Sequence, residues 1–214
     1  FTCQPRFDST SATYIIVLMK YKIGLVVGRF QPFHKGHLYL IKKALELTDK
    51  IIIAVGSSNV SDENNPLDYQ TRVKMLEKVI ELENLKDKIM KIVPSPDDPN
   101  DDIWLVKLLK NAGKFDIALG NNDWTNGILE KAGYKVLEIP FLNRSIYQGT
   151  IIRKLIKENK KWQNLIPSYL VKTFSKPLKL LLYNMDMTVK KNSKTDTKSK
   201  SSFEETINVK GEEL

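Results

Sequence analysis

The two histidines of the sequence, His34 and His37, stand three residues apart in the segment Gly28-Arg-Phe-Gln-Pro-Phe-His-Lys-Gly-His37. Imidazole groups can donate hydrogen bonds to phosphoryl oxygens as negative charge develops on them in a transition state. Gly36 has no Cβ, so the backbone can pass close to a ligand there. These residue types at this spacing indicate phosphate chemistry. The alternative, two structural histidines beside a turn packed by phenylalanines, does not account for their joint placement.

The segment that carries the histidines joins an expected strand to an expected helix. An apolar run over residues 23–27 precedes it, and apolar residues at helical spacing follow over residues 38–45. Backbone N–H groups and the helix dipole at such a junction hold phosphate groups. Residue type and expected position therefore support the same interpretation.

A second segment, Asn143-Arg-Ser-Ile-Tyr-Gln-Gly-Thr-Ile-Ile-Arg153, leads from a loop into an expected helix. Thr150 could cap this helix and offer its hydroxyl to a phosphate. Arg153 lies one turn further on the same face, where its guanidinium could bind phosphate oxygens through two hydrogen bonds. Taken alone, the segment is explained better by a capped helix with a surface arginine. Beside His34 and His37, phosphate binding is the better interpretation.

Strand and helix patterns alternate along the chain from residue 23. The alternation predicts one α/β domain with a doubly wound, Rossmann-like parallel sheet, followed by C-terminal helices. Ligands bind at the carboxyl ends of such strands, so the segments after Gly28, Gly56, Pro94 and Gly120 should line one cleft. The expected strands cover residues 23–27, 51–55, 89–93, 115–119 and 135–139. Helices are expected after His37, after an N-cap at Asp68, from Asp101 or Asp102, and over residues 127–131, 150–157 and 167–174.

Composition and charge limit the class of protein. With 214 residues, 42% of them hydrophobic, the chain suits one globular domain, which we expect over residues 21–180. Residues 1–20 are expected to be a flexible extension, and residues 188–214 a disordered tail. The net charge of +9 suits anionic ligands, whereas no basic run interleaved with aromatic residues suggests a nucleic-acid partner. No apolar run approaches the roughly 20 residues of a membrane helix, and a single cysteine, Cys3, fits the reducing cytoplasm.

The segment from Gly28 to His37 resembles the signature of the HxGH nucleotidylyltransferases, and its full wording is similar to that of archaeal-type nicotinamide-nucleotide adenylyltransferases. The segment from Arg144 to Arg153, followed by Trp162 and Leu165-Ile-Pro167, continues a resemblance that covers about residues 21–175. The family implies an enzyme acting on ATP and nicotinamide mononucleotide (NMN). In that reaction the 5′-phosphate of NMN attacks the α-phosphate of ATP, giving NAD and pyrophosphate without a covalent enzyme intermediate.

The resemblance also implies roles for individual residues. It makes His34, His37 and Arg153 catalytic. It places at ATP the residues Gly28, Arg29, Phe30, Gln31, Gly36, Tyr147, Gly149 and Thr150. It places at the acceptor nucleotide the residues Asp97, Trp104, Gly120, Asn121 and Arg144, although Trp104 could equally be a core residue and Asp97 a solvated loop acid. Magnesium would be held chiefly by ATP and water, with no protein ligand. A homo-oligomer is implied, with no nucleic-acid or membrane partner.

The sequence departs from the family pattern after Gly56. The loop over residues 57–66 lacks the family's histidine and any basic residue, and Asp62 and Glu63 could oppose the distal phosphates. On the acceptor side, Asn122-Asp123 replaces the usual Pro-Leu. Two alternatives therefore stay open: an HxGH enzyme with another acceptor, such as FMN or phosphopantetheine, and a non-catalytic ATP or NAD sensor. A class I aminoacyl-tRNA synthetase fragment is disfavoured, because its Lys-Met-Ser-Lys-Ser-like loop has only a poor substitute in the chain.

Overall fold

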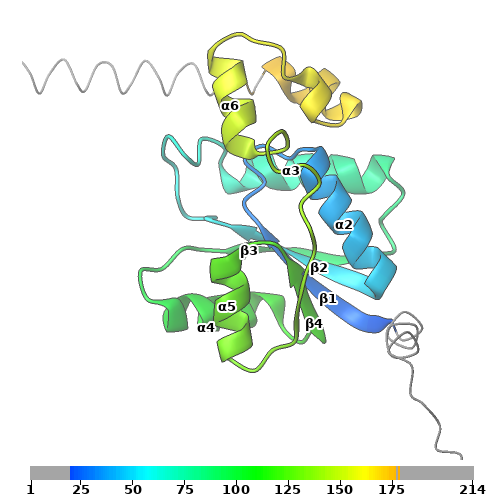
Figure 1. Cartoon of the computed structure of the whole chain (residues 1–214), viewed down its shortest axis with the longest axis vertical. Helices are drawn as coiled ribbons and strands as arrows, with labels where there is room; N and C mark the ends of the chain where they lie inside the picture. Colours follow the sequence, from blue (N-terminus) through cyan, green and yellow to red (C-terminus); the bar gives the residue numbers. More distant parts are fainter. Residues whose placement is uncertain (1–19, 177, 179–214) are drawn as a thin grey trace, which may run out of the picture.

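The computed structural model describes residues 20–176 and 178. In this part of the chain a parallel sheet lies between two layers of helices (Figure 1). This is the doubly wound, Rossmann-like α/β fold predicted from the sequence. The extension predicted over residues 1–20, apart from residue 20 itself, lies outside the described residues. So do Cys3 and the tail predicted over residues 188–214.

The sheet contains parallel strands in the order β3-β2-β1-β4-β5, so the chain winds outward from β1 in both directions. Residues 51–56 of β2 are all buried, because helices cover both faces of a central parallel strand. The register pairs Gly28 with Val55 and Gly56 with Ser95, which brings three strand ends to one edge. The strands are β1 (Tyr21–Gly28), β2 (Thr48–Gly56), β3 (Ile89–Ser95), β4 (Ile117–Gly120) and β5 (Val136–Glu138).

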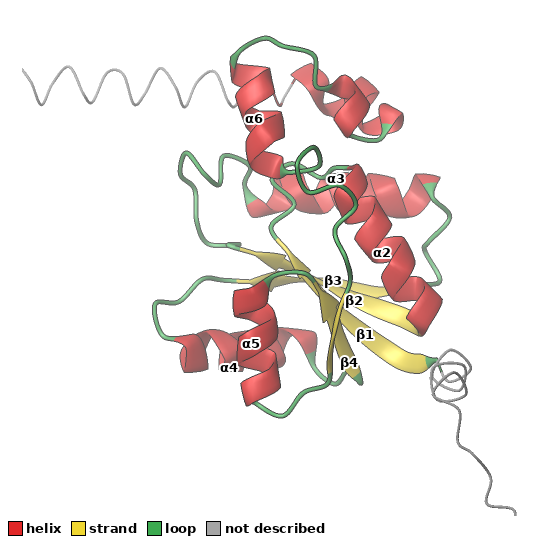
Figure 2. Ribbon diagram, in the orientation of Figure 1, coloured by secondary structure: helices red, strands yellow, loops and turns green. Residues whose placement is uncertain are grey.

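Helices cover the two faces of the sheet (Figure 2). Helices α2 and α3 lie on one face, and α4 and α5 lie on the other. Helix α6 and a helical segment over residues 168–176 join the apolar cluster on the α2–α3 side. The helices are α2 (Lys35–Leu47), α3 (Tyr69–Leu82), α4 (Asp101–Ala112), α5 (Asp123–Lys131), α6 (Gly149–Lys157) and the 3-10 helix η1 (Gln163–Leu165).

Short polar side chains begin three of these helices. The predicted N-cap Asp68 accepts a hydrogen bond from the backbone N–H of Thr71 at 2.6 Å. Asn100 caps α4 and Asn122 caps α5 in the same way. Because asparagine is among the strongest N-caps, α5 begins at Asp123, ahead of the predicted residue 127.

Helix α4 leaves some of its apolar residues exposed. Ile103 and Val106 are 47% and 65% exposed, whereas Trp104 and Leu108 are buried. Apolar residues lie almost all the way round this helix, so its pattern does not specify which stripe faces inward. The indole buries the largest area and takes the inner side.

Strand β4 is shorter than predicted because two residues before it have other partners. The ring of Phe115 stacks on Tyr134, with centroids 4.9 Å apart. The Asp116 carboxylate accepts the backbone N–H of Ile23 at 2.8 Å. The strand therefore begins at Ile117.

A chain of polar contacts fastens the C-terminal helical segment to the end of α3 and to α2. Tyr169 donates its hydroxyl to Glu83 at 2.8 Å, and Glu83 pairs with Lys42 at 2.7 Å. Burial and the Glu83 carboxylate raise the pKa of Tyr169, so this hydroxyl stays a donor. Among the described residues, no helix combines the length and apolar character needed to cross a bilayer.

Candidate active site

His34 and His37 close the first turn of α2 by bonding to each other's backbone. The Nδ1 atom of each ring accepts the backbone N–H of the other residue, both at 3.3 Å. The two rings stack with centroids 3.7 Å apart. Since both Nδ1 atoms are acceptors, the proton of each neutral ring lies on Nε2, which is therefore a donor. The first turn of α2 thus offers two oriented N–H donors.

Burial keeps both imidazoles neutral at pH 7. It lowers the pKa of His34 to about 4. It also lowers the pKa of His37 well below its usual range, and His34 and Arg29 lower it further. An anion bound beside the rings would raise both pKa values, because it favours the charged form.

The residues before His34 shape the turn that presents the rings. Phe30 has a left-handed backbone, with φ of 53°, and its ring is wholly buried. That ring lies 4.7 Å from the His37 ring, measured between centroids. A Cβ on Gly28 would come within 2.9 Å of the Phe30 ring. Gly28 and Phe30 therefore support the histidine rings, whatever contact they also make with a ligand.

Gly36 allows the two predicted segments to meet. A Cβ at this position would lie 3.0 Å from the His34 ring and 3.1 Å from the Cβ of Tyr147. We expected Gly36 to let the backbone approach a ligand. In this structure it lets two segments of the same chain approach each other. It places Tyr147 beside the histidine turn.

Helix α6 brings the second segment onto the backbone of the first. A Cβ on Gly149 would lie 2.5 Å from the carbonyl oxygen of Gln31, so only glycine permits this contact. Arg153, 6% exposed, donates from Nη1 to the same carbonyl at 2.7 Å. The prediction that Thr150 caps α6 was wrong: the N-cap is Gln148, without a side-chain bond, because the helix already begins at Gly149. The Thr150 hydroxyl instead accepts from Arg153 Nη2 at 3.4 Å.

Gln31 ties the histidine turn to the loop over residues 57–67. Its amide nitrogen donates to the Leu67 carbonyl at 2.8 Å, and its amide oxygen accepts the Leu67 N–H at 3.0 Å. The side chain expected at ATP is therefore held by backbone groups. Its position fixes the loop against the turn.

The two acids of that loop have partners of their own. Glu63 pairs with Lys157 of α6 at 2.8 Å. Asp62 accepts the backbone N–H groups of Asn64 and Asn65 at 2.8 and 2.7 Å. Neither acid lines the cavity described below. The structure therefore gives less reason than the sequence did to expect that these acids repel the distal phosphates of ATP.

Arg72 of α3 holds the ends of β1 and β2 together, and nothing in its sequence context predicted this. It is wholly buried. It donates to the carbonyl oxygens of Arg29 at 2.8 Å, Gly56 at 2.6 Å and Ser57 at 3.0 Å. Its Nε donates to the Asp68 carbonyl at 3.2 Å. One buried guanidinium thereby fixes the backbone on both sides of the strand ends.

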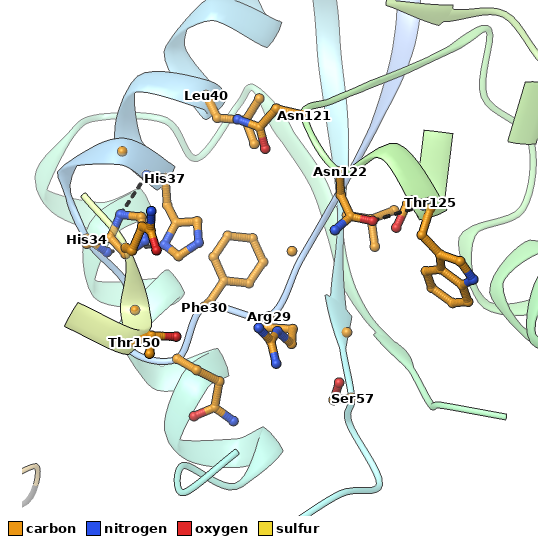
Figure 3. A pocket seen from close by; sticks show the side chains of 18 of the residues that line it. Arg29, Phe30, His34, His37, Leu40, Ser57, Asn121, Asn122, Thr125 and Thr150 are labelled. Atoms are coloured by element: carbon orange, nitrogen blue, oxygen red, sulfur yellow. Dashed lines mark hydrogen bonds between the residues drawn. The ribbon is translucent and has the colours of Figure 1, made fainter. Parts of the chain in front are cut away.

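A cavity of about 850 Å³ opens at the carboxyl ends of the strands, where the sequence predicted a cleft. Figure 3 shows His34, His37 and Thr150 on one side and Asn122 and Thr125 on the other. The predicted residues that line it are Gly28, Arg29, Phe30, Gln31, His34, Gly36, His37, Asp97, Trp104, Asn121, Arg144, Tyr147, Gly149, Thr150 and Arg153. Gly120 does not line it, because this residue ends β4 one position before Asn121.

Trp124 is the main residue of the cavity that sequence reasoning missed. It lines the cavity and is 48% exposed, whereas the predicted Trp104 is only 2% exposed. The two rings meet in a tilted contact with centroids 4.6 Å apart. The Nε1 of Trp124 donates to Asp101 at 3.2 Å, which steadies the ring. Its place three residues after Asn121 of the Gly120-Asn121 turn was the available signal.

Asp97 is positioned by Asn59, another residue that the sequence did not single out. The backbone N–H of Asp97 donates to Asn59 Oδ1 at 2.7 Å, and Asn59 Nδ2 donates to the Asp97 carbonyl at 3.2 Å. This reciprocal pair joins the loop after β2 to the loop after β3. It leaves the Asp97 side chain at the cavity wall.

Within residues 20–176 and 178, no three His, Cys, Asp or Glu side chains gather as a metal-binding group. The side of the cavity that carries His34 and His37 offers nitrogen donors and the hydroxyls of Ser57 and Thr150. This set suits a divalent ion whose ligands come mainly from a bound nucleotide and water.

The fold and the cavity together define a doubly wound α/β protein with a cavity at the carboxyl ends of its strands, the place where such folds bind nucleotides. Residues 25–155 match the model of the cytidylyltransferase-like family. The described structure is similar to a bifunctional NMN adenylyltransferase/ADP ribose pyrophosphatase from Francisella tularensis, solved with AMP and a manganese ion (TM-score 0.61, 22% identity). That match covers 83% of this chain and 56% of the other, so the chain spans little more than half of that protein. At this identity the likeness concerns the fold.

The curated relatives give a closer likeness. A nicotinamide-nucleotide adenylyltransferase of Saccharolobus solfataricus is 39% identical over 145 residues, covering 67% of this chain and 84% of the relative. The corresponding protein of Thermococcus kodakarensis is 31% identical over 147 residues, covering 68% and 78%. The chain therefore belongs to the nicotinamide-nucleotide adenylyltransferases, a nucleotidyltransferase family with the cytidylyltransferase-like fold.

Proposed function

We propose that this protein transfers the adenylyl group of ATP to NMN, giving NAD and pyrophosphate. The observation that carries the proposal is the pair of buried imidazoles whose Nδ1 atoms are held by backbone N–H groups. This arrangement leaves two Nε2–H donors at the turn where a nucleotide's phosphates would bind. The family relationship supplies the reaction type.

In the proposed reaction an oxygen of the NMN phosphate forms a bond to the α-phosphorus of ATP. The bond from that phosphorus to the bridging oxygen breaks, and pyrophosphate leaves with the electron pair. His34 and His37 donate hydrogen bonds to oxygens of the α-phosphoryl group, where negative charge is redistributed. No side chain needs to accept the transferred group, because positioning and charge stabilisation account for most of such a transfer.

Cationic side chains meet the remaining charge of the triphosphate. Because the two imidazoles are neutral, this task falls to Arg29 and Arg153, which line the cavity beside them. Arg153 already donates to the Gln31 carbonyl through Nη1, so its guanidinium is fixed before the ligand arrives. Magnesium, held by the triphosphate and water, would neutralise phosphate charge.

The opposite side of the cavity would take NMN. Arg144 lines the cavity and lies over the ring of Phe141, with 4.4 Å between the guanidinium carbon and the ring centroid. It is suited to the acceptor phosphate. Asp97 and Asn121 offer oxygens and an amide to ribose hydroxyls, and Trp124 offers an exposed ring to the base.

We further expect a homo-oligomer acting in the cytoplasm, without nucleic-acid or membrane partners. Light scattering would report the oligomeric state.

The test is pyrophosphate release from MgATP with NMN, nicotinic acid mononucleotide, FMN or phosphopantetheine as acceptor. Release with NMN, with NAD formed in equal amount, is the expected result. Release with FMN or phosphopantetheine alone would keep the chemistry and replace the acceptor class. ATP binding without release in any mixture would instead favour a sensor.

Two arginine variants test the assignment of the two sides. Arg153→Ala should raise the KM for ATP by on the order of tenfold or more, with a smaller effect on NMN, because it removes a charged hydrogen-bond donor. Arg144→Ala should show the reverse pattern. If both variants changed the same KM, the two sides of the cavity would be wrongly assigned.

A further inference from the structure

The segment between β5 and α6 is folded on itself at the edge of the cavity. We call residues 140–148 the lip segment; its first seven residues are all exposed. The Asn143 carbonyl accepts the backbone N–H of Ile146 at 3.0 Å. Gln148 donates its side-chain amide to the Arg144 carbonyl at 2.6 Å. Within the described part of the chain, no hydrogen bond joins these first seven residues to a residue outside the lip segment.

Both ends of the lip segment are fixed to the rest of the protein. Before it, the buried Ile139 donates its backbone N–H to the Gly120 carbonyl at 2.8 Å. After it, Gly149 packs against the backbone of Gln31. A compact unit between two fixed points can turn as one body, with its two ends as hinges.

The lip segment presents apolar side chains at the cavity without burying them. Phe141 and Leu142 are 39% and 38% exposed, and both line the cavity. Single exposed apolar side chains are ordinary on a protein surface. Two adjacent ones at the edge of a cavity indicate a surface that is covered when the cavity is filled.

A charged side chain couples this apolar surface to a ligand. Arg144 lines the cavity, and its guanidinium carbon lies 4.4 Å from the centroid of the Phe141 ring. It forms no salt bridge with any acid in the described ranges 20–176 and 178. A phosphate in the cavity would attract this guanidinium, and the Phe141 ring beneath it would follow.

We propose, on the basis of the adenylyltransferase function above, that the lip segment is a lid that closes over the bound nucleotide. Arg144 contacts phosphate in the closed position only, which gives the ligand the differential affinity that any such shift requires. Phe141 and Leu142 then cover the mouth of the cavity and exclude water. Exclusion of water protects the reaction, because water attacking the α-phosphorus in place of the acceptor would turn ATP into AMP and pyrophosphate.

A pulsed EPR distance measurement tests the closure. Spin labels are attached at Ile146→Cys on the lip segment and Asp102→Cys at the start of α4, in full-length protein carrying Cys3→Ser. Ile146 and Asp102 are exposed and do not line the cavity. NAD is the ligand, because the product does not turn over without pyrophosphate. We expect saturating NAD to shorten the distance between the labels by more than about 2 Å, the scale at which loops rearrange on binding.

A second label pair and a binding measurement separate the possible outcomes. Labels at Asp102→Cys and Lys74→Cys, on helices that cover opposite faces of the sheet, should keep their distance when NAD is added. Calorimetry measures NAD binding to each labelled protein. NAD binding with an unchanged distance from residue 146 would overturn the lid while the proposed function stood. Failure of the unlabelled protein to bind either NAD or ATP would overturn the function, and the lid with it.

Two variants distinguish a lid from a simple contact with the ligand. Phe141→Ala should speed NAD dissociation about tenfold, since it removes apolar surface that closure buries. Pro140→Gly should speed it by about threefold or more although Pro140 does not line the cavity, because a freer backbone makes the closed position costlier. Stopped-flow fluorescence follows the dissociation through Trp124, since the other two tryptophans of the chain are buried.

Leu137→Ala is the matched control for these variants. Leu137 is 40% exposed, like Phe141, but it lies in β5 and does not line the cavity. Its NAD dissociation should equal that of the unmodified protein, and thermal unfolding checks that all three variants are folded. Faster dissociation in Phe141→Ala alone would make Phe141 a ligand contact on a static wall and overturn the lid.

Discussion

The two ends of the cavity are built in different ways. At the phosphate end, the side of the cavity with His34, His37 and Arg153, these three side chains are already bonded: His34 and His37 to each other's backbone, and Arg153 to the Gln31 carbonyl. At the acceptor end, the side of the cavity with Ser95 and residues 121–125, Trp124 is 48% exposed, and the buried Ser95 hydroxyl has no hydrogen-bond partner among the described residues. The difference suggests that the phosphate end is organised before binding, whereas the acceptor end completes its bonds with the ligand. Variants at the two ends should therefore have different kinds of effect.

The largest effect should come from His37→Ala. Loss of an oriented donor to the α-phosphoryl group should lower turnover by on the order of 100- to 1,000-fold. Steady-state pyrophosphate release measures the loss, and circular dichroism checks the fold. Glu46→Ala, at the exposed end of the same helix, is the control and should keep full turnover. Turnover within a few fold of the unmodified protein in His37→Ala would remove the histidine from the reaction.

Arg72→Met should show that the phosphate end is stabilised by its supporting bonds. Removing the guanidinium leaves the carbonyls of Arg29, Gly56 and Ser57 without their donor. We expect the free energy of unfolding in urea to fall by about 2–3 kcal/mol and the KM for ATP to rise. Lys74→Met, an exposed change on the same helix, should stay within about 0.5 kcal/mol. A variant as stable as the Lys74→Met control would show that the strand ends hold without Arg72.

Acid should lower the stability of the folded protein through His34. The unfolded chain takes up a proton near pH 6.5, whereas the folded protein resists it until about pH 4. The free energy of unfolding should therefore fall as pH drops from 6.5 to 4, by up to about 1.4 kcal/mol per pH unit for this group. His34→Asn removes the titration but keeps a residue able to cap α2. The stability advantage of the unmodified protein over the His34→Asn variant should shrink towards pH 4; parallel curves for the two proteins would contradict the assigned burial effect.

The smallest change in stability should come from Thr150→Ala. This variant tests whether the Thr150 hydroxyl serves a ligand or caps α6. Thr150→Ala should lower the free energy of unfolding by no more than about 0.5 kcal/mol, since Thr150 caps nothing in α6. Asp68→Ala, which removes the bond to the Thr71 N–H, should cost about 1 kcal/mol. Thermal and urea unfolding measure both. Thr150→Ala should still impair ATP use, and a stability loss equal to that of Asp68→Ala would restore Thr150 as a cap.

Most residues on both sides of the cavity could be predicted from the sequence, but the exposed indole of Trp124 at the acceptor end could not. The His34–His37 spacing specifies a local capping arrangement within one turn, so residue type and position are read together. Gly149 was expected at ATP by resemblance, but its close contact with the Gln31 carbonyl was not predicted. The roles of the residues at both ends stay proposals, whereas the structure shows that these residues line one cavity.

Contacts between distant segments were the part that the sequence did not reveal. Arg72 looks like any arginine on a helix, and only the packing of α3 under the strand ends gives it three carbonyl partners from distant segments. Trp124 was passed over in favour of Trp104 because no local pattern says which of two neighbouring helices turns its indole outward. The face of α4 was unclear for the same reason. The fold itself was predictable because alternation of strands and helices is a property of the whole chain.

The bond from Arg153 to the Gln31 carbonyl joins residues 122 positions apart in sequence. A chain emerging from the ribosome can pair β1 with β2 long before it can make this bond, because α6 is synthesised after every strand of the sheet. Contacts between such distant residues also form late in refolding, since their loops are long. The growing polypeptide should therefore acquire its core first and its capacity to hold triphosphate last. ATP would then bind the completed protein and not the partly synthesised chain.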